Sequence, residues 1–325
     1  MTTQTTRIAC FNDFHKLLVD DLEFFQYPVN DLVSRYGWEY MNEAVSILNS
    51  LESFAARHGD SLEKVLAGYA DYVRKSAIEY QDFQKNGRYR QTGQEELDQI
   101  LSDPAFHLNY LYTLTLSTLL NRSRYELFKN YRAVAAPHFP PGGRALEIGC
   151  GNCLDATFAS HHAQVDAYEL NPYSACWQEI LDLEHRVVLH LEWYAFDSEQ
   201  TYDFVTMIEI LEHLREPEQY LRGAYRVLKN GGHAYLTFAV RMPQIDHLFQ
   251  FDSVDECREL VCRNSFRIVN EFCTISTYRS FEESERWKLA DDPRHAVIYC
   301  CLAQKDAFQP ADDLVSAFNE PYDFS

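Results

Sequence analysis

Residues 145–153 read Ala-Leu-Glu-Ile-Gly-Cys-Gly-Asn-Cys, an apolar segment followed by two glycines one residue apart. This pattern is typical of a β-strand that leads into a tight turn, because glycine adopts backbone angles that other residues avoid. The N–H groups of such a turn can approach a ligand at the N-terminus of the next helix. Glu169 stands 20 residues after Gly149, behind a second apolar segment, where doubly wound folds place an acid for ribose hydroxyls. This order predicts a nucleotide-binding α/β fold.

The rest of the second half alternates short apolar segments with helical ones, such as the expected helix at 220–228. Strands separated by helices favour right-handed crossovers and a parallel sheet that is covered on both faces. A short connection near the C-terminal end predicts one antiparallel edge. The expected strands are 144–148, 165–170, 187–191, 204–208, 233–240, 266–269 and 296–303.

The first half of the chain has a helical pattern up to residue 137. Apolar residues recur at helical spacing from Ala44, and a second stripe begins at Leu62. Asp60, with Glu63 three residues on, predicts a capping box for this second helix. Prolines and glycines then break the chain before residue 144. We therefore expect three parts, which are a helical domain over 1–137 that acts as a lid or in dimerisation, an α/β domain over 138–305, and a tail over 306–325.

The charge of the chain limits its partners. It has 325 residues, of which 29 are basic and 49 acidic, and its formal net charge is −20. This charge disfavours nonspecific binding of nucleic acid, because it repels phosphates. No apolar run approaches the ~18 residues that cross a bilayer, residues 1–10 lack the features of a signal peptide, and nine scattered cysteines are typical of reduced thiols. We expect a cytoplasmic protein that binds a small molecule and neither nucleic acid nor a membrane.

Four successive motifs over residues 125–305 resemble those of class I S-adenosylmethionine-dependent methyltransferases. They are the Glu-Ile-Gly-Cys-Gly turn with the acid of the second strand, Tyr-Asp-Phe-Val-Thr-Met from 202, Ile-Leu-Glu-His-Leu from 210 and Arg-Val-Leu-Lys-Asn-Gly-Gly from 226. The resemblance implies a Rossmann-like, seven-stranded sheet and S-adenosyl-L-methionine as cofactor. It also implies that the turn holds the methionine part, that Glu169 holds the ribose, and that Glu192 or Trp193 borders the adenine.

The turn departs from the family at one position. The family has a third glycine where this chain has Cys153, so the Cβ of Cys153 either shifts the cofactor or points away from it. A dinucleotide dehydrogenase is the alternative within the fold, but its fingerprint needs a glycine at position 154, which is Leu154. The residues predicted to bind the cofactor are Glu147, Gly149, Cys150, Gly151, Cys153, Glu169, Glu192, Trp193 and Glu209.

A third feature, Glu-Ile-Leu-Glu-His at 209–213, follows the fourth expected strand. Side chains at i, i+3 and i+4 share one face of a helix, so two carboxylates and an imidazole could converge on one cation. This segment and Asp-His-Leu-Phe-Gln-Phe at 246–251 resemble the metal-binding segments of the Hen1 family, which methylates the 2′-hydroxyl at RNA 3′ ends. The resemblance implies a divalent metal ion with the ligands Glu209, Glu212, His213 and His247.

The same segment is also common in methyltransferases that bind no metal, where the histidine lines the substrate pocket and the glutamate caps a helix. Without a metal, His213 or His247 would be the catalytic general base, because imidazole titrates near neutral pH. Asp246 is expected to face the substrate. Arg88 and Arg90 form a local basic loop that could clamp a carboxylate or phosphate of the substrate. A solvated loop between helices is the alternative for these arginines.

These features predict a methyltransferase of secondary metabolism that acts on a small metabolite, such as a chelating 2-oxo or hydroxy acid, with assistance from a metal. One alternative is an RNA 3′-terminal 2′-O-methyltransferase, which the Hen1-like segments favour and the net charge of −20 disfavours. Another is a catalytically silent methyltransferase-like domain that binds a partner. We also expect a homodimer, since helical N-terminal extensions often build dimers in related enzymes.

Overall fold

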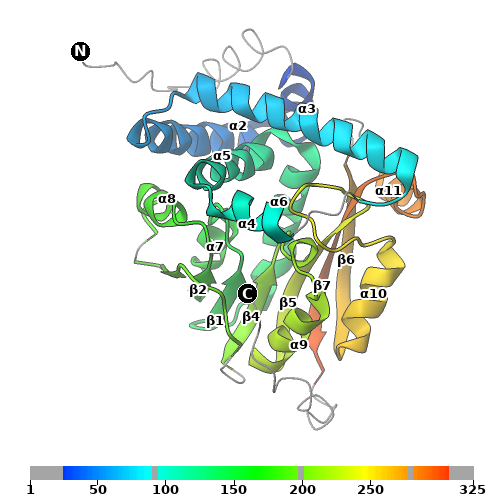
Figure 1. Cartoon of the computed structure of the whole chain (residues 1–325). Coiled ribbons are helices and arrows are strands. Elements are labelled where there is room, and N and C mark those ends of the chain that lie inside the picture. The colour runs from blue at the N-terminus through cyan, green and yellow to red at the C-terminus, as the bar shows by residue number, and fades with distance from the viewer. Residues whose placement is uncertain (1–24, 90–93, 184, 197–200, 277–280, 307–325) are drawn as a thin grey trace.

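The computed structural model describes residues 25–89, 94–183, 185–196, 201–276 and 281–306. In Figure 1 a twisted sheet occupies the lower part of the molecule, and the long helices of the N-terminal half lie across its upper end. The predicted combination of an α/β sheet with an N-terminal helical region is confirmed.

The sheet has seven strands in the order β3-β2-β1-β4-β5-β7-β6. They are β1 (Arg144–Ile148), β2 (Gln164–Tyr168), β3 (Val187–His190), β4 (Tyr202–Met207), β5 (Leu228–Val240), β6 (Phe266–Ile275) and β7 (Val297–Lys305). All seven predicted strands are present. Only β7 is reversed, and it pairs antiparallel with both β5 and β6. The antiparallel strand was predicted at the edge of the sheet. β7 instead lies one strand inside the edge, because β6 pairs with its outer side.

Helices cover both faces of the sheet and its upper end (Figure 1). Those of the N-terminal half are α2 (Gln26–Arg57), α3 (Leu62–Asn86), α4 (Gln94–Ser102), α5 (Pro104–Leu120), α6 (Arg122–Ala135) and the 3-10 turn η3 (Ala136–His138). Those between and after the strands are α7 (Leu154–Ala159), α8 (Ser174–Ile180), the 3-10 turn η4 (Leu211–His213), α9 (Pro217–Val227), α10 (Val254–Arg263) and α11 (Glu283–Ala290).

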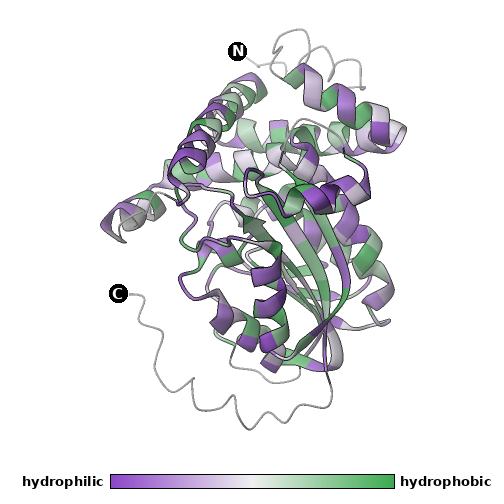
Figure 2. Ribbon diagram, turned by 90° about the vertical axis from the view of Figure 1, so that its right-hand side faces the viewer, coloured by the Kyte–Doolittle hydropathy of each residue, from purple (hydrophilic) through white to green (hydrophobic). Residues whose placement is uncertain are grey.

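Hydropathy follows this layering. In Figure 2 the strands are mostly hydrophobic, and the surrounding helices carry hydrophilic residues on their outer sides. β7 is buried at nearly every position, as expected for a strand that is covered on both faces. In the described part of the chain, no helix combines the length and the apolar character that a membrane span requires.

The cap of α3 differs from the predicted capping box. Ser61 is the N-cap, and its hydroxyl accepts a hydrogen bond from the N–H of Lys64. The Asp60 carboxylate instead contacts the Lys64 ammonium and accepts a hydrogen bond of 3.1 Å from the Tyr112 hydroxyl of α5. Asp60 is thus committed to a contact between two helices, which the local sequence pattern does not reveal.

The N-terminal helices share a hydrophobic cluster with the sheet-bearing half. Buried residues of α2, α3 and α5 pack together with Leu154 of α7 and Trp177 of α8. The Trp177 ring lies edge-on to Phe54 at 5.4 Å, and its Nε1–H donates to the Asn152 carbonyl at 2.7 Å. The helices are therefore packed onto the sheet through common core residues.

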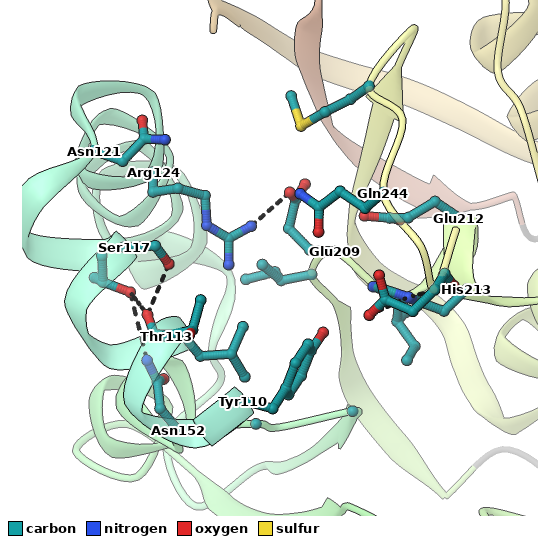
Figure 3. Close-up of a pocket in the computed structure, with 18 of the residues that line it drawn as sticks. Tyr110, Thr113, Ser117, Asn121, Arg124, Asn152, Glu209, Glu212, His213 and Gln244 are labelled. Carbon is teal, nitrogen blue, oxygen red and sulfur yellow. Dashed lines mark hydrogen bonds and ion pairs between the residues drawn. The ribbon is translucent and has the colours of Figure 1, made fainter. Parts of the chain in front are cut away.

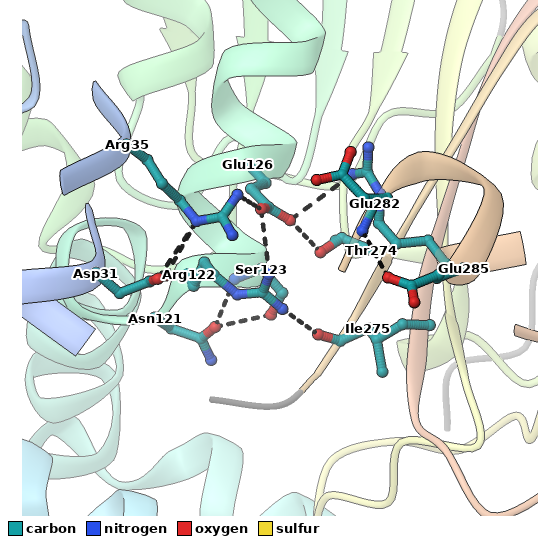
Figure 4. A network of polar contacts seen from close by, with 11 residues as sticks. Asp31, Arg35, Asn121, Arg122, Ser123, Glu126, Thr274, Ile275, Glu282 and Glu285 are labelled. Carbon is teal, nitrogen blue, oxygen red and sulfur yellow. Dashed lines mark hydrogen bonds and ion pairs between the residues drawn. The ribbon is translucent and has the colours of Figure 1, made fainter. Parts of the chain in front are cut away.

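A buried polar network makes a second connection between the two halves (Figure 4). The Glu126 carboxylate of α6 lies within 4.0 Å of guanidinium groups from Arg35 of α2, Arg122 of α6 and Arg286 of α11. It also accepts a hydrogen bond from the Thr274 hydroxyl of β6. A buried carboxylate without ionic partners would cost folding free energy. The Glu126 carboxylate therefore holds α2 and α11 against α6 through their arginines.

Candidate active site

A cavity of about 500 Å³ opens above the carboxyl ends of β1, β2 and β4, under the N-terminal helices. This edge is where open α/β sheets bind ligands. Most of the residues predicted from the sequence line it, namely Glu147, Gly149, Cys150, Gly151, Glu169, Glu192, Trp193, Glu209, Glu212, His213, Asp246 and His247. Arg88 and Cys153 do not line it, and Arg90 lies outside the described residues.

The turn after β1 requires its glycines. Gly149 has φ +71° and Gly151 φ +49°, in the left-handed region that favours glycine. A Cβ on Gly149 would lie 2.8 Å from the Cδ1 atom of Ile210. The N–H of Gly149 donates to the Tyr168 carbonyl of β2 at 2.8 Å. The turn is therefore held tightly against the end of β2.

Glu169 is fixed beside this turn by backbone donors. Its carboxylate accepts hydrogen bonds from the N–H groups of Gly151, Leu170 and Asn171, at 2.7, 2.8 and 2.9 Å. The predicted ribose-binding acid thus lies at the end of β2 and in contact with the glycine turn, as the sequence spacing indicates.

Cys153 turns away from the cavity. It has φ +53°, is fully buried, and its Sγ lies 3.5 Å from the Sγ of Cys150. A cysteine thus adopts a left-handed backbone at this position. Of the two outcomes predicted for its Cβ, the structure has the second, in which the side chain points into the core.

Two acids, one buried and one half-buried, lie beside the glycine turn. Glu147 of β1 is 4% exposed, and one oxygen each of Glu147 and Asp155 is buried without a hydrogen-bond partner among the described residues. Burial, with a smaller effect from Asp155, raises the pKa of Glu147 well above its usual range. Burial also raises the pKa of Asp155 to about 6, against the opposing charges of Arg124 and Arg132. This pair therefore holds a proton at neutral pH and offers its oxygens to a cationic ligand.

Glu209 does not join the predicted metal cluster. Its backbone is left-handed, with φ +52°, and its carboxylate pairs with the Arg124 guanidinium of α6 at 2.5 Å (Figure 3). Thr237 of β5 fixes this geometry, because its hydroxyl accepts from the Glu209 N–H and donates to the Glu209 carboxylate. The helix-like face predicted for residues 209–213 therefore begins only at η4.

Glu212, His213 and His247 do come together. One ligand atom from each lies within 4.8 Å of the others. The backbone carbonyl of Glu212 accepts from the N–H groups of Leu248 and Phe249, at 2.8 and 3.0 Å, which ties η4 to the loop after β5. These bonds bring His247 beside His213, with ring centroids 4.8 Å apart. We name these three residues the Glu212 cluster.

Both histidines of the cluster are oriented by backbone carbonyls. The Nδ1 of His213 lies 3.0 Å from the Asp246 carbonyl, and the Nδ1 of His247 lies 2.6 Å from the Met242 carbonyl. A carbonyl only accepts, so each Nδ1 carries the proton. The Nε2 of a neutral ring is then left as a ligand.

The charges in the cluster are uneven. Glu212 is 1% exposed, and neither of its carboxylate oxygens has a hydrogen-bond partner among the described residues. Burial, and then the charge of Glu209, raise its pKa to about 8. Burial lowers the pKa of His247 to about 3, whereas for His213 the Asp246 and Glu212 carboxylates outweigh burial and raise the pKa. The site therefore combines a protonated carboxyl group with one neutral imidazole and one that is readily protonated.

Arg124 and Asp155, which face the cavity from α6 and α7, escaped the sequence analysis. Tyr72 and Tyr110 face the cavity from α3 and α5, although aromatic residues in this half of the sequence favour a core or a dimer contact over a substrate site. Arg124 and Asp155 left a signal, because Arg124 is basic in a strongly acidic chain and Asp155 lies in the first turn of the helix after the glycine turn. The predicted substrate arginine, Arg88, is exposed behind the left-handed Gly87 that ends α3. Arg88 therefore faces solvent, which agrees with the alternative interpretation of a solvated loop.

The chain is similar in sequence to curated methyltransferases over about a third of its length. The chain is 34% identical over 116 residues to the ubiquinone biosynthesis O-methyltransferase of Xanthomonas axonopodis pv. citri (strain 306), which is 34% of this chain and 48% of that protein. It is likewise 34% identical over 108 residues to the protein of the same name from Xanthomonas oryzae pv. oryzae (strain PXO99A), covering 31% and 45%. The chain thus spans about half the length of the curated relatives it matches.

Solved structures align with part of the chain at low identity. The [4+2]-cyclase SpnF aligns with 57% of this chain and 83% of its own, at 17% identity and a TM-score of 0.44. The Burkholderia thailandensis 1,6-didemethyltoxoflavin-N1-methyltransferase, solved with S-adenosylhomocysteine, aligns with 63% and 91%, at 15% identity and a TM-score of 0.42. A family model described as a methyltransferase domain matches residues 120–293, which is more than half of the chain. The protein therefore belongs to the methyltransferase domain family.

Proposed function

We propose that this protein transfers a methyl group from S-adenosyl-L-methionine to a small metabolite whose two neighbouring oxygens chelate a metal ion, as in a 2-oxo or hydroxy acid. The observation that carries the metal part is the Glu212 carboxylate, which is buried with neither oxygen partnered among the described residues, beside two imidazoles. Family membership and the glycine turn support the cofactor part.

The cofactor would lie along the carboxyl ends of β1, β2 and β3. We assign the methionine part to the turn of Gly149 and Gly151, the ribose to Glu169, and the adenine to the half-open segment of Glu192 and Trp193. Glu147 and Asp155 would face the ammonium group, and Arg124 the carboxylate. S-adenosylmethionine supplies a methyl group on a sulfonium, and the residues of the chain align it with the acceptor.

The Glu212 cluster suits a transition metal. One carboxylate and two imidazoles, each anchored through Nδ1–H, form a donor set typical of iron or zinc. Glu209 is not in this set, because it pairs with Arg124. A divalent ion at this site would supply Lewis-acid charge that makes a substrate hydroxyl or enol nucleophilic at neutral pH. The cluster itself would hold the acceptor oxygens at the end of the cavity that adjoins the cofactor.

Two alternatives are weaker on these observations. An RNA 3′-terminal substrate would bring phosphates to a chain of net charge −20 and to a cavity lined by the Glu169 and Asp246 carboxylates, and like charges repel. In a catalytically silent domain, the cavity acids whose oxygens have no hydrogen-bond partner among the described residues would have no role. Retention of RNA in a filter-binding assay at low salt would favour the first alternative, and calorimetry without S-adenosylhomocysteine binding would favour the second.

The test of the metal site is the metal content of the purified full chain. We expect one divalent ion per chain, and we expect Glu212→Gln to weaken zinc binding at least about tenfold in calorimetry. Glu216→Gln, a change of an acid four residues further along the chain, is the matched control and should bind zinc like the wild type. Wild-type protein that holds no divalent ion, and an activity that a chelator does not alter, would contradict metal assistance.

A further inference from the structure

The cavity continues beyond the Glu212 cluster along one face of α3. No residue of α3 between Ala70 and Phe83 is buried, although this stretch contains several apolar and aromatic side chains. The residues of α3 that line the cavity, from Tyr69 to Tyr80, recur at helical spacing and therefore share one face. We name this lined face the substrate arm, and it consists of Tyr69, Tyr72, Val73, Ser76, Ala77 and Tyr80.

The end of the arm nearest the cluster is polar. The Tyr72 hydroxyl donates to the Gln244 side-chain carbonyl at 3.0 Å. Tyr110 approaches the same region from α5, and Figure 3 shows its ring reaching between Glu209 and His213. Burial, and then the charge of Asp246, raise the pKa of both tyrosines. Both hydroxyls therefore keep their protons. Tyr72 already donates its proton to Gln244, and the Tyr110 hydroxyl can donate to an acceptor molecule at the cluster.

The walls behind these hydroxyls are aromatic on two helices. On α3 the rings of Tyr69 and Tyr72 are stacked with centroids 6.1 Å apart, and on α5 those of Phe106 and Tyr110 are stacked at 5.6 Å. All four rings belong to residues that line the cavity. Aromatic walls favour a planar ring over an alkyl chain, because offset and edge contacts between rings add to the burial of apolar area.

We propose that the acceptor carries a neutral aromatic ring, which occupies the substrate arm while its two chelating oxygens face the Glu212 cluster. This inference rests on the proposed function, because the metal site orients the chelating end. None of the six residues of the arm is charged, and the Asp246 carboxylate at its cluster end would repel a phosphate group on the substrate. The substrate arm thus selects the aromatic ring of the acceptor, and the Glu212 cluster selects its two chelating oxygens.

A matched pair of probes separates the ring from the chelating head. Benzohydroxamate and acetohydroxamate share the same two oxygens and differ in a phenyl ring against a methyl group. On the metal-loaded full chain with S-adenosylhomocysteine, we expect benzohydroxamate to bind about tenfold more tightly, or more, in calorimetry. Equal affinity for the two hydroxamates would overturn the proposal.

Two variants of α3 localise the effect. Ala77→Trp fills the arm and should remove the preference for benzohydroxamate, with the affinities for acetohydroxamate and S-adenosylhomocysteine unchanged. Ile78→Trp is the matched control, because Ile78 is 59% exposed and lies outside the cavity lining. Ala77→Leu is a milder variant for the case that the tryptophan impairs folding. A preference that survives both Ala77 variants in folded protein would also overturn the proposal.

Failure of the metal site is distinguishable from failure of the arm. If elemental analysis finds no metal in the purified chain, that result alone refutes the metal part of the proposed function. The arm is then tested with phenol by saturation-transfer NMR on the metal-free chain. Transfer to phenol that Ala77→Trp abolishes and Ile78→Trp preserves supports the aromatic arm, whereas no transfer in the wild type overturns it.

Discussion

At the scale of single residues, Glu209 shows how one backbone angle redistributes charge. A left-handed conformation costs a residue with a Cβ about 1 kcal/mol or more. Here it is maintained by two hydrogen bonds with Thr237 and by the ion pair with Arg124. In an ordinary helix, Glu209 would lie on the same face as Glu212. The observed angle instead leaves Glu212 as the only carboxylate of its cluster.

We expect Asp155 to set the pH dependence of cofactor binding. Its pKa of about 6 means that it is neutral below pH 6 and charged above it. Because the proposed ligand group is an ammonium, we expect the affinity for S-adenosylhomocysteine to rise with pH from 5 to 7, by up to about tenfold per unit below the pKa. Asp155→Asn should bind more weakly and lose this rise. Calorimetry at a series of pH values measures both effects.

The control for this prediction is Asp182→Asn. Asp182 is exposed, lies outside the cavity lining and has φ +56°, an angle that asparagine tolerates. This variant should keep the wild-type pH profile. A profile that stays unchanged in Asp155→Asn would show that another group controls the binding.

At the scale of elements, the turn between β1 and α7 combines backbone strain with close packing. Gly149 and Gly142 have similar backbone angles, with φ +71° and +68°. A Cβ on Gly149 would meet Ile210 at 2.8 Å, whereas a Cβ on Gly142 would have nothing within 4 Å. Alanine substitutions at the two glycines therefore separate the free-energy cost of the backbone angle from the free-energy cost of the contact with Ile210.

We expect Gly149→Ala to lower the free energy of unfolding by about 1–3 kcal/mol more than Gly142→Ala does, because only the first forces the Ile210 side chain to move. Gly149→Ala should also weaken the binding of S-adenosylhomocysteine, and Gly142→Ala should not. Urea unfolding and calorimetry test the two expectations. Equal losses of stability in both variants would mean that the contact with Ile210 relaxes freely.

At the scale of the whole molecule, the N-terminal helices act as part of the catalytic half. The hydrophobic cluster that joins α2, α3 and α5 to α7 and α8 has Trp177 at its boundary. α3 supplies the substrate arm and α6 supplies Arg124, so the cavity is complete only when both halves are packed together. The helical and α/β parts predicted from the sequence thus depend on each other for the site.

We expect Trp177→Ala to lower the free energy of unfolding by about 3–5 kcal/mol, because the ring is fully buried between the two halves. The effect should appear in one cooperative transition that circular dichroism and fluorescence report at the same urea concentration. Trp38→Ala, at a position that is 70% exposed, is the control and should change the stability by about 0.5 kcal/mol or less. Two separate transitions, of which only one shifts, would contradict a shared core.

The sequence by itself determined the alternation of strands and helices, the glycine turn and the acid at the end of β2. These follow from local backbone preferences and from short-range spacing, so Gly149 and Glu169 were found without a structure. It also indicated His213 and His247, through motifs that lie 34 residues apart. Their orientation, however, depends on backbone carbonyls that only the folded loop brings near.

The tertiary structure alone decided the partner of Glu209, the inward direction of Cys153, the exposure of Arg88 and the entry of Arg124 into the cavity. The conformation of Glu209, for example, depends on a group that is distant in the sequence, because Thr237 of β5 holds its backbone. The physical reason is that a local pattern fixes which backbone conformations are favourable. Burial and the balance of charges among packed elements then decide where a polar side chain finds its partner.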